Sequence, residues 1–376
     1  MSQRTASPKK ILFFTPLGGI SGSELLLLRT LQHADSKIVK TAVFCEKPGV
    51  MGQMLPPDVP FFTNPFQVKG LSSKWLKLKN ALSGSVYIDY LKKIQASFQA
   101  DYWYLNTIMM AHVAPIAQEL GVPLISHFHE LPHIHFEPVA YEHLKSMIEQ
   151  SVCCIGNAEI TCEKLQIMGA KQIGKVYPFV EFEKIKTDSR QLVTIRERLN
   201  IPTSAFVWVI AGAPTYAKGI EHLPTLAAAF PNDFFVWIGK DTRSGSFYFT
   251  EQEMVYRKLQ NVRFVGLQTS DYYHYLGLGN GLLLLSREES FGMVNLEALQ
   301  LGMPVVAFPS GGVSEIVQEG MGKVISSWNV SDFITAMKQV KTGEIPFDAT
   351  KALKHIAQFN QATQMAAWHQ IIQSLP

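Results

Sequence analysis

Two glutamates stand eight positions apart in the stretch SREESFGMVNLEALQLGMPVV, residues 286–306, of a chain that is only 17% charged. A small-residue turn at Phe291 and Gly292 separates Glu289 from Glu297. Carboxylates accept strong charge-assisted hydrogen bonds, and the vicinal hydroxyls of a sugar or a ribose can donate them. The spacing therefore indicates a site for a hydroxyl-bearing ligand, although ordinary capping or solvated acids would give the same pattern.

The elements around the two glutamates can be predicted from the sequence. The apolar run Leu282–Leu285 predicts a buried strand, and residues 293–301 predict a helix that Gly302 and Pro304 end. Backbone N–H groups in the first turn of a helix have no partner within the helix, so they can bind phosphate. A diphosphate bound there would leave one acid near each of the two hydroxyl-bearing groups of a nucleotide-sugar.

Short apolar runs alternate with amphipathic helical stretches along the whole chain. Most runs are continuous in apolar residues, which is typical of strands buried on both faces of a parallel sheet. Repeated strand–helix units predict an α/β fold with doubly wound sheets. The predicted strands are Ile11–Thr15, Lys40–Phe44, Tyr102–Asn106, Pro123–His127, Ser151–Ile155, Val207–Ala211, Phe234–Gly239, Arg263–Val265, Leu282–Ser286 and Pro304–Phe308.

This pattern of strands and helices occurs twice, so two domains are expected. Residues 1–180 are predicted to form a first Rossmann-like domain, and residues 190–350 a second. The polar stretch 181–191 is predicted to be a linker, and residues 351–376 a C-terminal helix that packs back toward the first domain. Two such domains facing a central cleft would place the carboxyl ends of their strands along it, where these folds bind ligands.

The composition argues against several classes of protein. A formal net charge of +3 over 376 residues is too small to indicate binding to nucleic acid. The four cysteines form neither a disulfide framework nor a zinc-binding spacing, so we expect reduced thiols. The first residues have no signal-peptide pattern, and no apolar run approaches the roughly 20 residues that span a bilayer. A cytoplasmic location is expected.

The longer block SREESFGMVNLEALQLGMPVVAFPSGGVSEIV, residues 286–317, resembles the hallmark of the family 4 retaining glycosyltransferases, which have the GT-B fold. That hallmark is a Glu, seven residues and a second Glu, with Phe-Gly between them. The resemblance implies that Glu289 contacts the donor sugar and has a catalytic role, and that Glu297 binds the ribose hydroxyls. It also implies donor contacts at Gly266, Ser290, Phe291, Gly292, Met293 and Val294.

Segments of the first half resemble the same family in the same order. FFTPLGGISGSELLLLRTL, residues 13–31, resembles its first glycine-rich loop, which implies that Gly18 and Gly19 lie near the donor. SHFHELPH, residues 126–133, resembles its His-Glu segment, which implies that His129 orients the transferred sugar as a catalytic residue. The acceptor contacts implied are Gly22, Asn106 and Glu130.

IAGAPTYAKGIEHLPTLA, residues 210–227, resembles the opening of the family's second domain. Lys218 would be the catalytic and donor-binding cation that neutralises the diphosphate. The family often adds an Arg before this Lys, but Ala217 and Ala213 stand at those positions. Losing one of two cations that stabilise the leaving group slows the chemistry, unless another base such as Arg243 replaces it.

The implied activity is sugar transfer with retention from a UDP- or GDP-linked donor, with neither metal nor cofactor. The acceptor would be a glycan, as in polysaccharide biosynthesis, a lipid-linked glycan or a small molecule. In this family the acceptor attacks on the same face from which the phosphate leaves, and the phosphate takes the acceptor's proton.

Three other interpretations stay open. HFHELPHIHFE, residues 127–137, holds four histidines, and a strand would place His127 and His129 on one face, as in a metallohydrolase. The missing Arg partner of Lys218 suits a glycosyltransferase-like binding protein without activity. A GT-B relative with other nucleotide-sugar chemistry, such as epimerisation, is the third, and the block at residues 286–317 argues against it.

KGLSSKWLKLKNALSG, residues 69–84, has apolar residues at helical spacing and lysines mostly on another face. A helix packed on the first domain with a solvated basic face would have this pattern. An interfacial helix that binds an anionic membrane surface would have it too, and would suit a peripheral enzyme with a lipid-linked acceptor.

Overall fold

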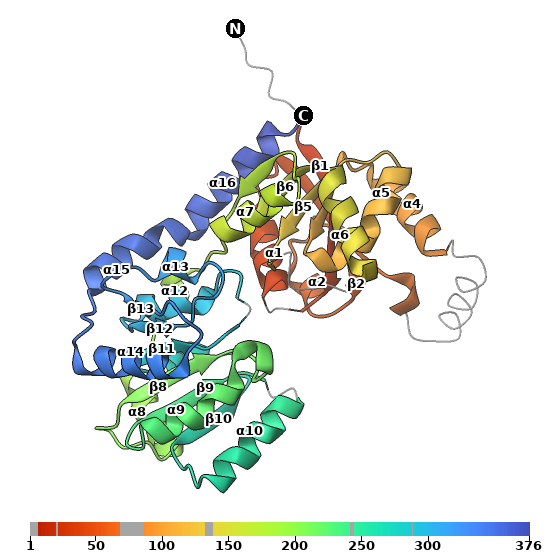
Figure 1. Cartoon of the computed structure of the whole chain (residues 1–376). Coiled ribbons are helices and arrows are strands. Elements are labelled where there is room, and N and C mark those ends of the chain that lie inside the picture. The colour runs from red at the N-terminus through yellow and green to blue at the C-terminus, as the bar shows by residue number, and fades with distance from the viewer. Residues whose placement is uncertain (1–6, 20–21, 68–85, 132–137, 241–243, 288) are drawn as a thin grey trace. The chain divides into compact units, whose positions relative to one another are not determined.

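The computed structural model describes residues 7–19, 22–67, 86–131, 138–240, 244–287 and 289–376. The chain divides into two compact units, Met1–Pro178 with Ala362–Pro376, and Phe179–Gln361 (Figure 1). Each unit has a parallel sheet with helices on it, which confirms the predicted α/β class with two doubly wound, Rossmann-like sheets. The predicted helix at residues 69–84 lies outside the described residues, as do His133, His135 and Arg243.

The first unit contains a seven-stranded sheet in the order β3-β2-β1-β4-β5-β6-β7, with every pair parallel. The chain builds outward from β1 in one direction and then returns to build outward in the other, which makes the sheet doubly wound. Its strands are β1 (Lys9–Leu17), β2 (Val39–Lys47), β3 (Phe61–Thr63), β4 (Tyr102–Asn106), β5 (Leu124–Phe128), β6 (Ser151–Gly156) and β7 (Ile173–Lys175).

The second unit repeats this plan with six parallel strands in the order β10-β9-β8-β11-β12-β13. The order reverses between β8 and β11, and ligands bind near such a switch point in open α/β sheets. Its strands are β8 (Val207–Ala211), β9 (Phe234–Ile238), β10 (Val262–Gly266), β11 (Gly281–Leu284), β12 (Val305–Ala307) and β13 (Gly322–Val324).

Helices connect successive strands in both units. Those of residues 1–178 are α1 (Ser23–Gln32), α2 (Met51–Met54), α4 (Val86–Phe98), α5 (Ala114–Glu119), α6 (Pro138–Gln150), α7 (Glu159–Ile167) and the 3-10 helices η1 (Pro65–Gln67) and η2 (Ile108–Val113). The later ones are α8 (Ser189–Arg198), α9 (Leu223–Ala229), α10 (Gly245–Tyr256), α11 (Tyr272–Leu276), α12 (Met293–Gln300), α13 (Val313–Ile316), α14 (Val330–Thr342), α15 (Ala349–Ile356), α16 (Gln361–Ser374), η3 (Phe182–Lys184), η4 (Tyr216–Lys218), η5 (Ile220–His222) and η6 (Ala357–Phe359). Within the described ranges, no helix is both long and apolar enough to cross a bilayer.

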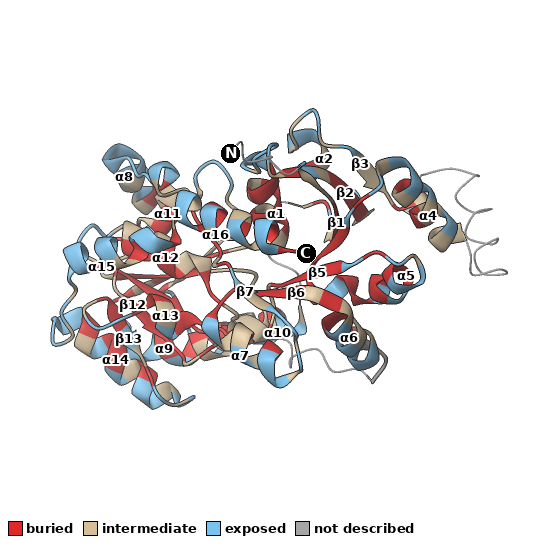
Figure 2. Cartoon of the chain, turned by 90° about the horizontal axis from the view of Figure 1, so that it is seen from above, coloured by how far each residue is buried: buried red, intermediate tan, exposed pale blue. Residues whose placement is uncertain are grey.

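The sheets are the most buried parts of both units, and the helices keep an exposed outer face (Figure 2). In the first unit the ring of Phe14 packs between Phe44 and Trp103, at centroid distances of 5.4 and 4.7 Å. In the second, Trp208 and Trp237 are almost fully buried. Burial of each such side chain stabilises the fold by about 1.5–3 kcal/mol, and this explains the continuous apolar runs.

The ten strands predicted from the sequence are confirmed, with ends that differ by up to three residues. Three further strands, β3, β7 and β13, were not predicted. Each has three residues and pairs at the edge of its sheet, so its own sequence carries little signal.

Two predicted elements differ from the structure. The polar stretch 181–191 is not a plain linker, because it contains η3 and the start of α8. The C-terminal stretch is not one helix but α15, η6 and α16, interrupted at Asn360. The side chain of Asp188 accepts hydrogen bonds from two backbone N–H groups and caps α8, which explains why helix begins inside the polar stretch.

The last helix, α16, packs against the sheet of the first unit (Figure 1). Trp368 is 1% exposed, its ring lies 6.3 Å from that of Phe13, and its Nε1 donates to the Tyr104 hydroxyl at 3.4 Å. His369 Nε2 accepts from the backbone N–H of Asp35 at 3.0 Å. Residues at the end of the chain therefore complete the core of the unit that begins it.

Candidate functional site

Most of the predicted donor residues lie in the second unit, at or just beyond the carboxyl ends of its strands; Gly18 and Gly19 lie in the first unit. Lys218 ends η4, which follows β8, and Glu289 lies in the loop after β11, the neighbouring strand. Lys218 Nζ donates to Glu289 Oε2 at 2.6 Å, and both side chains are partly buried. The structure thus brings together two residues that are 71 positions apart, because parallel neighbours end at the same edge of the sheet.

The loop that carries Glu289 is held by a second loop, after β12. The Glu289 backbone N–H donates to Ser310 Oγ at 2.8 Å, and the Ser290 carbonyl accepts from Gly312 N–H at 2.9 Å. Gly311 has φ +52°, and a Cβ there would lie 1.6 Å from the Glu289 carbonyl oxygen. Only glycine permits this close approach, which fixes the position of Glu289.

Glu297 lies in α12, about one turn past the start of the helix. The Tyr272 hydroxyl, from α11, donates to Glu297 Oε2 at 2.8 Å. Burial, and then the charge of Glu297, raise the pKa of Tyr272 well above its usual value, so this hydroxyl stays a donor. The carboxylate of Glu297 is therefore held in one orientation.

The start of α12 combines backbone donors with a buried amide. Gly292 is its N-cap residue, with φ 88°, and Met293 and Val294 provide the first backbone N–H groups of the helix. Asn295 is fully buried, and its side-chain amide has no hydrogen-bond partner within the described ranges. A buried amide without a partner costs about 1–3 kcal/mol, which is unusual for a position that only packs.

Two other residues of this unit that were predicted to contact the donor make contacts within the protein itself. The side chain of Phe291 is 1% exposed and its ring packs 5.4 Å from Phe359, so it anchors the loop in the core. Gly266 ends β10 with φ 72°, and its carbonyl accepts from Gly239 N–H at 3.0 Å.

Arg287 is a second cation beside the Lys218 turn. Its backbone N–H donates to the Ala217 carbonyl at 2.9 Å, and its guanidinium lies 4.1 Å from the ring centroid of Tyr216. The guanidinium also pairs with Glu221 and contacts His222 Nε2 at 3.1 Å. The positive charge of Arg287 is therefore already balanced by the carboxylate of Glu221.

In the first unit, His129 and Asn106 meet at the ends of β5 and β4. His129 Nε2 lies 2.9 Å from Asn106 Oδ1, while the Asn106 amide donates to the Ser23 carbonyl at 3.3 Å. Asn106 thus presents its oxygen to the ring, and the proton of a neutral His129 is on Nε2. Burial lowers the pKa of His129 to about 3, so the ring is neutral near pH 7.

The rings of His127 and His129 lie with their centroids 4.0 Å apart and their planes tilted by 43°, as expected for alternate residues on one face. His127 Nδ1 is bonded to the Tyr104 hydroxyl at 2.8 Å, and burial, followed by His129, lowers the pKa of His127 well below its usual value. Over the ranges that the structure describes, no group of three or more His, Cys, Asp or Glu side chains could hold a metal ion. His133 and His135 of this segment are not among them.

The first glycine-rich loop is placed by β2. Gly18 donates its N–H to the Lys47 carbonyl at 2.8 Å and accepts from Met51 N–H at 3.0 Å. Gly19 follows Gly18 in this loop, and Gly22, with φ 55°, is the N-cap residue of α1. These residues lie in the first unit, whereas Lys218 and Glu289 lie in the second.

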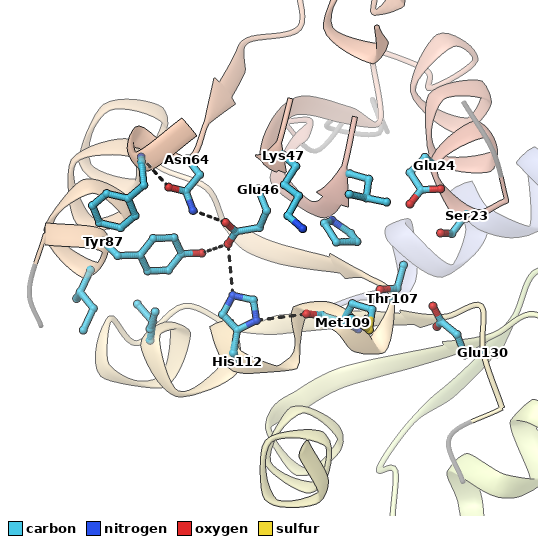
Figure 3. A pocket seen from close by; sticks show the side chains of 15 residues that line it. Ser23, Glu24, Glu46, Lys47, Asn64, Tyr87, Thr107, Met109, His112 and Glu130 are labelled. Atoms are coloured by element: carbon cyan, nitrogen blue, oxygen red, sulfur yellow. Dashed lines mark hydrogen bonds and ion pairs between the residues drawn. The ribbon is translucent and has the colours of Figure 1, made fainter. Parts of the chain in front are cut away.

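Glu130 lines a pocket of about 790 Å³ that lies wholly in the first unit (Figure 3). Burial raises the pKa of Glu130 to about 7, although backbone N–H groups, including that of Ile108, partly oppose this. Across the pocket, Glu46 accepts from Tyr87 and Asn64 and lies 3.3 Å from His112 Nε2. Burial would raise the pKa of Glu46, but these hydrogen bonds outweigh it and hold it below its usual value.

Several of these residues were not predicted from the sequence: Tyr272, Ser310, Asn295, Arg287, Glu24 and Glu46. Tyr272 and Ser310 lie 25 and 21 positions from the glutamates that they contact. No short spacing marks them, and only the order of the strands brings them together. The row of tyrosines at 272–273 and 275, after the glycine that ends β10, is the one local feature that could have drawn attention to Tyr272.

Much of the second unit resembles known proteins in its sequence. Residues 193–359 match the family described as glycosyl transferases group 1. N-acetyl-alpha-D-glucosaminyl L-malate synthase of Bacillus anthracis is 41% identical over 59 residues, which are 16% of this chain and 15% of that protein. Glycogen synthase of Mycobacterium tuberculosis is 30% identical over 135 residues, which are 34% of this chain and 32% of that protein. The matched segments thus span less than a third of these relatives.

A solved structure is similar over almost the whole chain. The HepE protein of Anabaena, crystallised with UDP and glucose, has a TM-score of 0.80 at 21% identity, covering 98% of this chain and 100% of that one. Residues 193–359 therefore carry the sequence of the glycosyl transferases group 1 family, and the chain has the fold of the GT-B glycosyltransferases.

Proposed function

We propose that this protein is a retaining glycosyltransferase that uses a UDP- or GDP-linked sugar and needs no metal ion. The observation that carries the proposal is the pairing of Lys218 with Glu289 at the start of α12, within the stretch that matches the family. A cation, a helix N-terminus and a carboxylate are the groups that a sugar diphosphate requires.

The diphosphate would compete with Glu289 for Lys218. When the phosphate takes over Lys218, the carboxylate of Glu289 is released from the 2.6 Å ion pair and can accept hydrogen bonds from the sugar hydroxyls. The backbone N–H groups of Met293 and Val294 would bind phosphate oxygens. Ligand binding would thus replace the ion pair between Lys218 and Glu289 by a contact of Lys218 with the phosphate and a contact of Glu289 with the sugar.

The ribose would be bound by Glu297. The hydrogen bond from Tyr272 orients this side chain, and a carboxylate can accept about four hydrogen bonds in all. A fixed carboxylate can then accept from both vicinal hydroxyls at little cost in side-chain entropy.

His129 would contact the transferred sugar as a neutral group. With its ring neutral near pH 7, it cannot act as a cationic acid. Its part would be to orient the sugar, held by Asn106, while the leaving phosphate takes the proton of the attacking hydroxyl.

The acceptor would be a glycan, a lipid-linked glycan or a small molecule. Two of the relatives support this range: the glycogen synthase is named for a glycan product, and the glucosaminyl malate synthase for a small-molecule product. We also retain the hypothesis of a peripheral enzyme that binds anionic lipid through residues 69–84. Co-sedimentation with phosphatidylserine vesicles at low salt tests it, and a protein that stays in the supernatant would contradict it.

The proposal is tested by the release of nucleoside diphosphate from UDP-glucose, UDP-galactose, UDP-N-acetylglucosamine and GDP-mannose, with and without EDTA, as the sugar is transferred to water or to an added sugar acceptor. One donor should be turned over in EDTA, and Lys218→Ala and Glu289→Gln should each lower the rate at least about a hundredfold. Glu253→Gln, which removes an exposed carboxylate of an i,i+4 ion pair in the same unit, is the matched control and should not change it. The anomeric configuration of the product, read by NMR, tests retention.

Binding of a nucleoside diphosphate without turnover of any donor would favour the inactive-protein interpretation. Ala213 and Ala217, where the family often has an Arg, would then be the first positions to restore.

A further inference from the structure

The pocket of the first unit has two acidic ends (Figure 3). At one end Glu46, from the end of β2, is fixed by Tyr87 of α4 and by Asn64. At the other end Glu24, from the first turn of α1, and Glu130, from the loop after β5, line the pocket from opposite sides. Three carboxyl groups from separate elements thus converge on one cavity of about 790 Å³, large enough for a sugar ring.

Glu24 is the side chain that points most clearly to a ligand. It is 8% exposed and lines the pocket, yet its carboxyl group is hydrogen-bonded only to its own backbone N–H among the described residues. Burial raises its pKa, and its charge adds to the rise at Glu130. Neither the buried Glu24 nor the partly buried Glu130 forms an ion pair with a Lys or Arg that the structure describes, so both are poised for a partner that donates hydrogen bonds or carries positive charge.

The remaining charges of the pocket do not balance these acids. Among the described lining residues, Lys47 is the one Lys or Arg, and it lies beside Glu46. The acidic and the Lys or Arg side chains of this described lining therefore bear up to three negative charges against one positive charge. Apolar side chains such as Leu17, Phe66 and Met109 form much of the rest of the wall, as for a sugar ring that presents both hydroxyl edges and an apolar face.

We propose that this pocket binds the acceptor as a polyhydroxylated sugar without acidic groups, whose hydroxyl or ammonium groups donate to Glu24, Glu46 and Glu130. The inference rests on the proposed function and names the class of its acceptor. A carboxylate or a phosphate on the accepting ring would meet like charges in a partly buried site, which is strongly unfavourable. The order expected is therefore amine-bearing sugar, then neutral sugar, then acidic sugar far behind.

Saturation-transfer NMR on the full chain tests the order with four probes: glucosamine, glucose, glucuronate and glucose 6-phosphate. Saturating UDP or GDP is present so that the acidic probes cannot use the phosphate site near Lys218. Glucosamine and glucose should bind, and glucuronate and glucose 6-phosphate should bind at least about tenfold more weakly. Equal binding of an acidic probe, or no binding of any probe, would overturn the proposal.

Variants that replace a carboxylate by a neutral amide test whether the weaker binding of acidic sugars comes from this pocket. Glu24→Gln with Glu130→Gln should bring glucuronate to within about threefold of glucose. Glu119→Gln, which removes an exposed carboxylate of α5 that pairs with Lys92, should leave the wild-type order intact. A double variant with the wild-type order would overturn the assignment of these two residues. If the double variant fails to fold, the wild-type discrimination is measured in increasing NaCl, where it should shrink, and an unchanged ratio would overturn the proposal.

Failure of the inference can be told from failure of the proposed function. Binding of UDP and of GDP is measured first by calorimetry in the same samples, and the diphosphate that binds is the one used in the NMR series. If one of them binds and acidic sugars bind as well as neutral ones, the acceptor class is wrong and the donor site stands. If neither binds, the proposed function fails, and the NMR series without nucleotide tests the pocket alone.

Discussion

Gly311→Ala should be far more damaging than a glycine substitution with the same backbone conformation elsewhere in the second unit. The matched control is Gly302→Ala, because Gly302 has φ +77° and a Cβ there would meet nothing within 4 Å. An L-residue in this left-handed region costs about 1–2 kcal/mol, partly offset by about 0.4–1 kcal/mol from the less flexible unfolded chain. The control should therefore lose about 0.5–1 kcal/mol.

The additional cost at Gly311 comes from contact with the loop that carries Glu289. A Cβ would lie 1.6 Å from the Glu289 carbonyl oxygen and 3.2 Å from Ser290 Cα, whereas carbon packs well at about 3.5–4.0 Å. These neighbours are backbone atoms, so the loop itself must move. Overpacking of this kind adds about 1–3 kcal/mol, for a total of about 2–4 kcal/mol.

Differential scanning calorimetry with titration of the UDP-linked sugar measures both effects. For a unit of this size about 1 kcal/mol lowers the melting temperature by about 2–4 °C, so we expect a fall of about 4–16 °C for Gly311→Ala and at most about 4 °C for the control. Affinity for the UDP-linked sugar that serves as donor should fall at least about tenfold in Gly311→Ala alone, because Glu289 would contact that sugar. Equal melting temperatures and equal donor affinities in the two variants would refute the reasoning that this close approach positions Glu289.

Three further predictions follow from other contacts. Tyr272→Phe removes the hydrogen bond that orients Glu297, so UDP should bind about tenfold more weakly. Pyrophosphate, which has no ribose, should bind as before. Equal losses of affinity for both ligands would contradict this. Glu130 has a pKa of about 7 in the folded state against about 4.5 unfolded, so the folded state holds the extra proton and stability falls as pH rises from about 4.5 to 7. Glu130→Gln should abolish this fall in the free energy of unfolding. The fall is at most about 3 kcal/mol, and smaller than that because the carboxyl group is partly exposed. If the free energy of unfolding in urea changes equally between pH 5 and pH 8 in the wild type and the variant, the prediction is contradicted. Trp368→Ala should destabilise the first unit by about 3–5 kcal/mol through the cavity that it leaves, whereas the exposed Gln370→Ala should change the free energy of unfolding by less than about 0.5 kcal/mol, as urea titration would show.

Much of the fold was predictable because long apolar runs report burial directly. Tyr102–Asn106 and Val207–Ala211 were predicted to the residue, since every position from 102 to 106 and from 207 to 210 is buried on both faces of its sheet. The edge strand β13, with the sequence GKV, is fixed by pairing with β12 rather than by its own residues. Such strands leave little trace in a local pattern.

The site divides in the same way. Glu289, Glu297 and Lys218 could be found because their spacing and neighbours resemble a known block. Tyr272 and Ser310 could not be, because only the strand order brings their loops to the two glutamates. In the acidic pocket of the first unit the resemblance pointed to Glu130 but not to Glu24 or Glu46, since the three glutamates come from separate elements, the loop after β5, α1 and β2.

Calorimetric titration of UDP, GDP and ADP into the full chain, in EDTA, tests the central claim that the second unit binds the diphosphate of a nucleotide-sugar. We expect one of the three to bind without metal, and Lys218→Ala and Glu297→Gln each to weaken that binding at least about tenfold while Glu253→Gln leaves it unchanged. Binding that requires a divalent cation, or that survives both variants, would contradict the account, as would the absence of binding by all three.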